Sequence, residues 1–176
     1  PPGPGEVLVK LAASGMCHSD EHLVTGDLPF QLPIIGGHEG GGVVEEVGEG
    51  VSWLAPGDHV VFGFIPSCGR CASCSTGHQS LCDLGAVIGL GRQMDGTSRH
   101  HAQGQDLGTM CILGTFAHHT VVNEASCIKV DDDVPLDRAC LLGCGVVTGW
   151  GSSVYAAEVG PGDVVAVVGI GGIGIN

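Results

Sequence analysis

The residues in this sequence best suited to chemistry are four closely spaced cysteines. Cys68, Cys71, Cys74 and Cys82 follow the pattern C-x2-C-x2-C-x7-C. Zinc takes a tetrahedral shell of four ligands, and thiolates on one short loop can converge on a single ion. The same C-x2-C-x2-C run also occurs in iron–sulfur proteins, and metal-free buried cysteines are the simplest alternative. The complete set of four favours a closed, stabilising zinc site within a lobe over residues 66–84.

A second group of candidate ligands is dispersed along the chain. Cys17 lies in the segment GMCHSD, His38 in GGHEG and Cys144 in GCG. A catalytic zinc takes about three protein ligands and keeps one position open, and two cysteines with one histidine are an established set. Each residue taken alone is more typical of core packing than of metal binding. Their combination is what makes a catalytic metal site a hypothesis worth testing.

A glycine-rich segment close to the end of the sequence could bind phosphate. It follows the apolar run Val164–Val168, which has the composition of a buried parallel strand. A strand followed by G-x-G-G-x-G is the setting in which a Rossmann fold binds the pyrophosphate of a dinucleotide, although the segment alone would also suit a flexible tail. The acidic residue expected roughly 20 positions later is not in this sequence. The four fingerprint glycines are Gly169, Gly171, Gly172 and Gly174.

The elements that must position these groups are mostly strands. Short β-branched apolar segments alternate with Gly, Pro and Asp, a pattern that predicts strands joined by tight turns and indicates an all-β barrel or sandwich. The turns Ala55–Asp58 and Gly160–Asp163 share the Pro-Gly-Asp signal. The predicted strands are Glu6–Leu11, Gly42–Val47, Asp58–Phe64, Phe116–Val122 and Cys127–Val130.

The pattern changes near residue 135. Val134–Asp137 resembles a helix start with proline in its first turn, and Arg138–Leu142 would continue it. A second helix is expected over Val147–Ala157, before the apolar run. The stretch Gly85–Gly114 shows no clear periodicity and is expected to be a long loop.

Composition excludes several classes of function. Lys and Arg total 6 against 19 Asp and Glu, for a net charge of -13, and no basic run is present to follow a nucleic acid backbone. No apolar stretch reaches the ~18 residues of a membrane span, so a soluble globular protein is expected. Nine cysteines without a secretory leader favour reduced thiols and a cytoplasmic protein. Because the sequence begins PPGPG without an initiator Met, we expect it to continue at both ends.

Taken in order, the motifs resemble the zinc-dependent alcohol dehydrogenases of the medium-chain dehydrogenase/reductase superfamily. The resemblance covers essentially the whole chain, through CHSD at 17–20, GHEG at 37–40, the four cysteines, GCGVVTG at 143–149 and GIGGIG at 169–174. It implies a mainly β, partly open GroES-like barrel that forms a catalytic domain over residues 1–146. The start of an α/β Rossmann domain for NAD, truncated in this sequence, would follow at 147–176.

The resemblance also implies the roles of single residues. Cys17, His38 and Cys144 would bind a catalytic zinc, and the four-cysteine lobe a structural one, giving two zincs per subunit. Ser19 would accept the proton of the alcohol and His22 would pass it to solvent. Asp20 and Glu39 match carboxylates that orient a ligating imidazole or tune the charge of the metal.

Contacts to the cofactor follow in the same way. His18 lies where the family contacts the pyrophosphate, and Thr148 belongs to a Thr-Gly pair near the nicotinamide. The four fingerprint glycines would pack against the dinucleotide. Because the rest of the Rossmann fold is needed to bind NAD, this chain alone is expected to be inactive.

Within the family, the long segment between Cys82 and Phe116 resembles the class III-type branch, which contains formaldehyde–thiol-adduct dehydrogenases and the actinobacterial nicotinoproteins. The overall sequence, rather than a diagnostic residue, favours the nicotinoprotein side. His118-His119 departs from the Glu-Tyr or Gln-Tyr pair of the family. The implied function is hydride transfer from a zinc-bound small alcohol, or a hemiacetal-like adduct, to NAD, forming an aldehyde in the case of a primary alcohol, by an enzyme that is a homo-oligomer when intact.

Three alternatives remain beside that function. The chain could be a zinc-binding structural or interaction module without turnover, or a member of the thiol-adduct branch. A metal-free relative similar to quinone reductases is the third, and the complete set of ligands argues against it.

Overall fold

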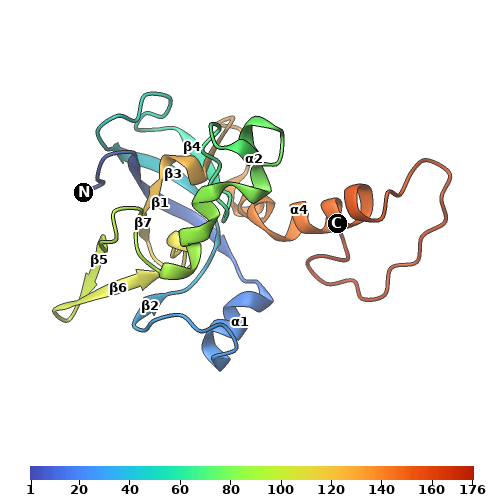
Figure 1. Ribbon diagram of the computed structural model, residues 1–176, viewed down its shortest axis with the longest axis horizontal. Helices are drawn as coiled ribbons and strands as arrows, with labels where there is room; N and C mark the ends of the chain where they lie inside the picture. The colour runs from blue at the N-terminus through green and yellow to red at the C-terminus, as the bar shows by residue number, and fades with distance from the viewer.

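The computed structural model describes residues 1–176 and is built around a five-stranded antiparallel sheet. Its strand order is β7–β1–β3–β4–β8 (Figure 1). A smaller sheet, with the order β2–β6–β5, lies at one side. The bounds of the large sheet are β1 Glu6–Gly15, β3 Glu39–Val47, β4 His59–Phe62, β7 His119–Asn123 and β8 Cys127–Val130; those of the small sheet are β2 Ile34–Ile35, β5 His100–Ala102 and β6 Gln105–Thr109.

Both faces of the central strands are covered by apolar side chains. Successive side chains of a strand point to opposite faces, and β4 shows the consequence. Val60 and Phe62 pack into the main core together with Val7, Val9 and Val44. Val61 points the other way and packs against Leu136 and Ala139 of the following helical segment. A run of consecutive apolar residues is therefore buried on both sides.

The pairing of β1 with β3 carries the chain to its metal-ligand candidates. The register runs from Val7 opposite Val47 to Gly15 opposite Glu39, with two shifts on the way. The last pair lies directly before α1 (His18–Thr25) on one strand and directly after His38 on the other. This end of the sheet therefore brings residues 15–18 and 38–39 together.

Short helices complete the chain. The segment after α3 forms a bent helical unit that leads away from the sheet, and the residues after it loop outward and return, so that the C-terminus lies beside α4 (Figure 1). The helices after α1 are α2 Ala72–Ser75, α3 Leu136–Ala139 and α4 Gly145–Trp150, with a π-helical turn at Gly151–Ala156. The 3-10 turns are Gln79–Leu81, Asp83–Leu90, Met110–Ile112, Glu124–Ser126 and Cys140–Gly143.

Most predicted elements are confirmed, with ends shifted by a few residues. All five predicted strands form, and Cys127–Val130 has the predicted bounds. The helical segment expected after residue 134 begins at Leu136, and the next begins at Gly145 rather than Val147. Both predicted Pro-Gly-Asp turns form the same contacts, in which the Asp carboxylate accepts a hydrogen bond from the backbone N–H three residues earlier, at Ala55 and at Gly160.

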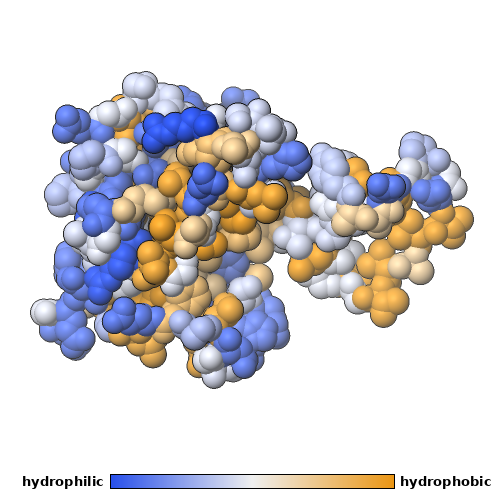
Figure 2. Space-filling model, viewed as in Figure 1, coloured by the Kyte–Doolittle hydropathy of each residue, from blue (hydrophilic) through white to orange (hydrophobic).

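The predicted strand over Val164–Val168 does not form, so this prediction is wrong. Val164 and Val168 are fully exposed, and the segment has no partner strand. A parallel strand needs a neighbour for its ladder and layers that cover its two faces. Figure 2 shows the resulting apolar surface on the part of the molecule that projects from the body.

The prediction of a long loop over Gly85–Gly114 is also wrong. The 3-10 turn Asp83–Leu90 opens this stretch, and β5 and β6 form a hairpin within it. The hairpin turns at Gln103 and Gly104, which both have positive φ, as a two-residue type I′ turn requires. Regular structure is present there without an apolar periodicity to reveal it.

By length and composition, no single helix suffices to cross a membrane. The helical segments Leu136–Gly143 and Gly145–Ala156 meet that criterion only as a pair, bent by 49°.

A partly buried ion-pair network attaches the region of the β5–β6 hairpin to the large sheet. Arg99 donates to both carboxylate oxygens of Glu6, at 2.7 and 2.9 Å, and also to Asp95 at 2.7 Å. The Glu6 and Arg99 side chains are 5% and 16% exposed. Hydrogen bonds from Arg99 and Thr97 hold the pKa of Asp95 well below its usual range. Glu6 is therefore a buried charge whose cationic partner is Arg99.

Replacing Arg99 should destabilise the protein strongly. Arg99→Met leaves the Glu6 carboxylate buried without its cation, and breaking such a pair costs about 3–5 kcal/mol. Urea unfolding followed by circular dichroism measures the change. The matched control is Arg92→Met, which removes an exposed pair with Asp106 at 3.2 Å and should cost less than about 1 kcal/mol. Equal losses in the two variants would contradict the assignment.

Candidate metal centres

The four cysteines of the lobe converge. The Sγ atoms of Cys68, Cys71, Cys74 and Cys82 all lie within 4.8 Å of one another, and the structure has all of them as free thiols. Cys71 caps the one-turn helix α2, which turns Cys74 back toward Cys71. The next two 3-10 turns bring Cys82 to the same point. This geometry suits a four-coordinate zinc with sulfur ligands.

Backbone N–H groups point at these sulfurs. The amides of Cys71, Cys74 and Cys68 donate to the Sγ atoms of Cys68, Cys71 and Cys82 at 3.4, 3.5 and 3.4 Å. Hydrogen bonds from Arg70 and Cys71 lower the pKa of Cys68 to about 6, and similar bonds lower that of Cys71. Burial raises the pKa of Cys82 to about 11. The loop is thus arranged to hold thiolates, and a dication would let all four sulfurs carry charge.

The dispersed ligands converge as well, at the end of the large sheet. Cys17, His38, Cys144 and Glu39 each place a ligand atom within 4.8 Å of the others. Cys17 lies at the N-cap of α1, His38 precedes β3, and Cys144 lies at the N-cap of α4. Residues 127 positions apart in sequence, Cys17 and Cys144, therefore share one site.

His38 is held against a buried carboxylate. Its ring is 3% exposed, and its Nδ1 lies 3.4 Å from Oδ1 of Asp20. The two side chains are in contact, but Nδ1 forms no hydrogen bond of good geometry. Asp20 is itself fixed, because its two oxygens accept from the backbone N–H groups of Cys17 at 2.9 Å and Gly37 at 3.0 Å. A carboxylate beside the second nitrogen is the usual arrangement around a metal-binding imidazole.

Glu39 was predicted to lie behind the ligands, but its carboxylate lies as close to them as they do to one another. Its side chain is buried, and Oε1 accepts from the N–H of Gly145 at 3.2 Å. A Cβ at Gly15 would collide with the Glu39 carboxylate and would lie 2.7 Å from Cδ2 of Leu141. Glycine at position 15 is therefore what gives the carboxylate its room. The sequence did not reveal this role of Gly15, because a contact across the β1–β3 pair leaves no local signal.

Negative charge accumulates at the dispersed cluster. Burial raises the pKa of Cys144 to about 12, and the nearby Cys17 and Glu39 add to the shift. Without a cation, Cys144 stays protonated. A zinc ion would supply the missing positive charge and allow both cysteines to bind as thiolates. The residues present therefore fit this metal.

The predicted relay and cofactor residues surround the cluster unevenly. Ser19 lies 3.7 Å from the Cys17 sulfur. His22 is half-buried and contacts Asp27 at 3.1 Å, and no hydrogen bond joins it to Ser19. His18 packs edge-on against His22, with ring centroids 4.6 Å apart. The three residues thus lie on one helix, but no continuous proton path links them.

A cavity of about 480 Å³ joins the ligands to the glycine-rich segment. Cys17, Glu39 and Cys144 line it together with His18. The fingerprint glycines Gly169, Gly171, Gly172 and Gly174 also line it. Thr148 is not among the lining residues; its N–H donates to the carbonyl of Cys144 and its own carbonyl accepts from Ser152. The cavity has space for a small molecule between the metal ligands and the glycines.

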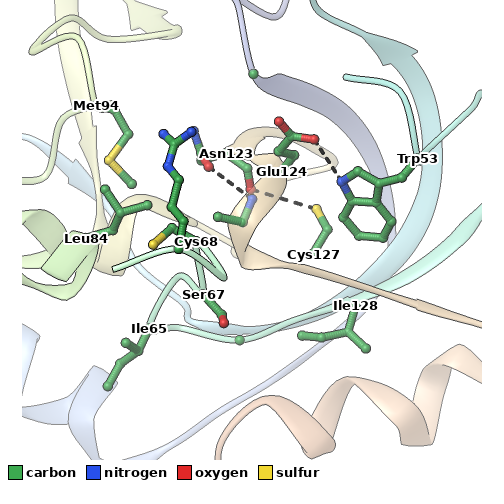
Figure 3. A pocket seen from close by; sticks show the side chains of 14 residues that line it. Trp53, Ile65, Ser67, Cys68, Leu84, Met94, Asn123, Glu124, Cys127 and Ile128 are labelled. Atoms are coloured by element: carbon green, nitrogen blue, oxygen red, sulfur yellow. Dashed lines mark hydrogen bonds between the residues drawn. The ribbon is translucent and has the colours of Figure 1, made fainter. Parts of the chain in front are cut away.

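A larger cavity, of about 720 Å³, lies beside the four-cysteine lobe, where Cys68 and Arg70 line it. Figure 3 shows Leu84 and Met94 beside Cys68 on one side and Trp53 and Ile128 on the other. Nε1 of Trp53 donates to Glu124 at 2.8 Å across its rim. None of the dispersed ligands lines it. Size alone would therefore point to the wrong site.

The comparisons with known proteins agree with this architecture. The model of the alcohol dehydrogenase GroES-like domain matches residues 3–132. The chain belongs to this family. Its predicted sheet-dominated GroES-like fold is thereby confirmed.

Named relatives are alcohol dehydrogenases. The chain is 55% identical to the NDMA-dependent alcohol dehydrogenase of Amycolatopsis methanolica and 54% identical to alcohol dehydrogenase B of Mycobacterium tuberculosis, covering 99% of this chain and 47% of each relative. The crystal structure of an alcohol dehydrogenase zinc-binding domain protein from Burkholderia ambifaria matches with a TM-score of 0.90 at 38% identity, over 99% of this chain and 48% of that one. The chain thus spans about half the length of these proteins. The resemblance to the actinobacterial branch is supported by these similarities.

We predict that the four-cysteine lobe binds one zinc. Cys74→Ser removes a buried ligand, so the chain should lose one equivalent of zinc, and residues 66–84 should become sensitive to protease because the metal contributes their folding energy. Elemental analysis and limited proteolysis measure the two effects. Cys140→Ala is the control, since Cys140 is also buried but belongs to neither cluster. A full zinc content in Cys74→Ser would refute the site.

We also predict that Asp20 positions His38. Asp20→Asn keeps the size of the side chain but removes its charge, and loss of such a partner weakens metal affinity roughly 10- to 100-fold. Competition with a chelator of known affinity measures zinc release from the dispersed cluster, while the four-cysteine lobe should be unchanged. Asp106→Asn, at an exposed pair with His101, should alter neither. An Asp20→Asn protein that holds both zincs normally would contradict this role.

Proposed function

We propose that the protein containing this chain is a zinc-dependent alcohol dehydrogenase that transfers hydride from a small alcohol, or a hemiacetal-like adduct, to NAD. The observation that carries the proposal is the convergence of Cys17, His38 and Cys144 on one point, where Cys17 and Cys144 line a cavity together with the glycine-rich segment. The similar proteins of the family are alcohol dehydrogenases, which supports the reaction class.

The ligand set suits a catalytic metal rather than a structural one. Two sulfurs and one imidazole leave a position open, in contrast to the closed shell of four sulfurs in the lobe. A zinc bound there would act as a Lewis acid that lowers the pKa of the substrate hydroxyl. Asp20 keeps His38 oriented. Glu39 supplies a buried carboxylate, and its position near the metal ligands is fixed by the hydrogen bond from Gly145 and by the space that Gly15 leaves.

Ser19 is proposed to accept the proton of the alcohol. Its hydroxyl lies beside the Cys17 sulfur, where a substrate oxygen would be within reach. His22, half-exposed three residues further along α1, would release the proton to solvent. A rearrangement or a bound hydroxyl group must bridge the two, because they do not touch in this structure.

The cofactor is proposed to lie across the cavity between α1 and the fingerprint glycines. His18 would contact its pyrophosphate, and the glycines would let the backbone approach closely. Thr148 would contact the nicotinamide only after a local change, since it does not line the cavity. We further propose two zincs per subunit, a cytoplasmic location and a homo-oligomer.

A module that binds zinc without turnover is the second candidate. The four-cysteine lobe alone would suffice for it, whereas the dispersed cluster, buried and beside a cavity, would have no purpose. The thiol-adduct branch of the family would share the whole metal chemistry and differ in substrate.

Zinc content and activity together separate the dehydrogenase from the module. We predict two zincs per chain in the full-length protein, and one in Cys17→Ala, with alcohol-dependent NADH formation lost while the lobe zinc remains. Elemental analysis and absorbance at the NADH band measure these. One zinc and no NADH formation in the unaltered protein would leave only the structural module, whereas full activity in Cys17→Ala would remove Cys17 from the catalytic site.

Replacing Ser19 should slow the reaction without loss of metal. Ser19→Ala removes the proposed proton acceptor, and such groups contribute about 10²- to 10⁴-fold, so kcat should fall by that order while both zincs stay bound. Ser152→Ala, which removes an exposed hydroxyl bonded to the Thr148 carbonyl, is the control and should keep its kcat. Unchanged kcat in Ser19→Ala would remove Ser19 from the relay.

A further inference from the structure

We propose that Thr115 is a positioning residue for the dispersed metal site, because it fixes the backbone on both sides of His38 and so directs the imidazole toward the cluster. The inference rests on the proposed function, since it requires a metal at the site of His38. Thr115 lies 76 positions from Glu39 in sequence, yet it contacts the peptide groups next to the ligand. It is 1% exposed, so these contacts are made inside the domain.

The backbone of Thr115 holds the segment that precedes the ligand. Its N–H donates to the carbonyl of Gly37 at 3.1 Å, and the N–H of Phe116 donates to the carbonyl one residue earlier at 3.0 Å. The N–H of Gly37 is held separately, because it donates to Oδ1 of Asp20 at 3.0 Å. The peptide groups before His38 are therefore fixed by two different parts of the chain.

The side chain of Thr115 holds the segment that follows the ligand. Its Oγ1 lies 3.3 Å from the carbonyl oxygen of Glu39 and 2.7 Å from Oγ of Ser14. The Ser14 hydroxyl donates to the same carbonyl at 2.8 Å. Two hydroxyl groups thus serve one carbonyl group. Because Thr115 is buried, these partners replace water for its hydroxyl and confine it to this place.

Two glycines give Thr115 its room. A Cβ at Gly37 would collide with Oγ1 of Thr115, and a Cβ at Gly40 would lie 2.6 Å from its Cγ2 methyl carbon. A β-branched side chain has a restricted χ1, so its hydroxyl and its methyl group are positioned together. Thr115 therefore packs closely against the chain both before and after His38.

Thr115→Val tests this role, because it keeps the shape of the side chain and removes the hydroxyl. We expect the zinc that Cys17→Ala lacks to be held about tenfold more weakly, at the lower end of the range for groups that orient a metal ligand. Competition with a chelator of known affinity, in the full-length protein, measures this. With Co²⁺ at the dispersed cluster, the d–d absorption bands should shift because the ligand angles change. Thr115→Ser keeps the hydroxyl and should restore most of the affinity and the original bands.

The matched control is Thr120→Val. Thr120 is also buried, and its hydroxyl donates to the carbonyl of Leu113 and forms no hydrogen bond with residues 36–40. This variant should keep the affinity and the spectrum of the dispersed cluster.

Three results would overturn the role of Thr115: unchanged affinity in Thr115→Val, equal weakening in Thr120→Val, or a Thr115→Ser protein as weak as Thr115→Val. In each of these cases the unaltered protein still holds both zincs, so the proposed function stands. An unaltered protein with no more zinc than Cys17→Ala would instead refute the proposed function and this inference with it.

Discussion

Burying negative charge is costly unless a positive partner is buried with it, and this constraint governs the end of the large sheet where the dispersed ligands converge. Cys17, Glu39 and Cys144 bring three acidic groups together at one partly buried point, with Asp20 beside His38. Fixed backbone N–H groups offset part of the cost, from Cys17 and Gly37 toward Asp20 and from Gly145 toward Glu39. The remainder is what a dication neutralises, so the metal and the fold stabilise each other.

The two cysteine sites solve this problem in different ways. In the lobe, the sulfurs lie on one short loop, and backbone amides next to the ligands point at them, so the site needs little support from the rest of the chain. The dispersed site depends on the β1–β3 register, on the entry into α1 and on the segment before α4. A register error in the sheet would destroy the second site and leave the first intact. The local site therefore stabilises its own loop, whereas the dispersed site forms only when the sheet has its correct register.

The same distinction decides what could be predicted from sequence. The lobe could be recognised from spacing alone, and the strands from their β-branched runs. The ligand set of Cys17, His38 and Cys144 came only from a resemblance to a family, because no local pattern links residues so far apart. Gly15 gave no signal at all, since its role arises from a contact made in the folded chain.

The two wrong predictions have physical causes of the same kind. Val164–Val168 has the composition of a strand, but pairing is a property of two segments, and an apolar run without a neighbour stays extended in solvent. The β5–β6 hairpin has the opposite problem. Its residues are polar, and its ladder is set by a turn in which Gln103, not the more usual Asn, adopts positive φ.

Each dispersed ligand lies where regular structure begins. Cys17 and Cys144 occupy helix N-caps, and His38 is the last residue before β3. At such positions the backbone leaves one element and its direction is free to change, so side chains from different elements can point at a common centre without breaking a hydrogen-bond ladder. The sheet sets where the strands end, the helix starts set the direction of the cysteine ligands, and the site forms where the two coincide.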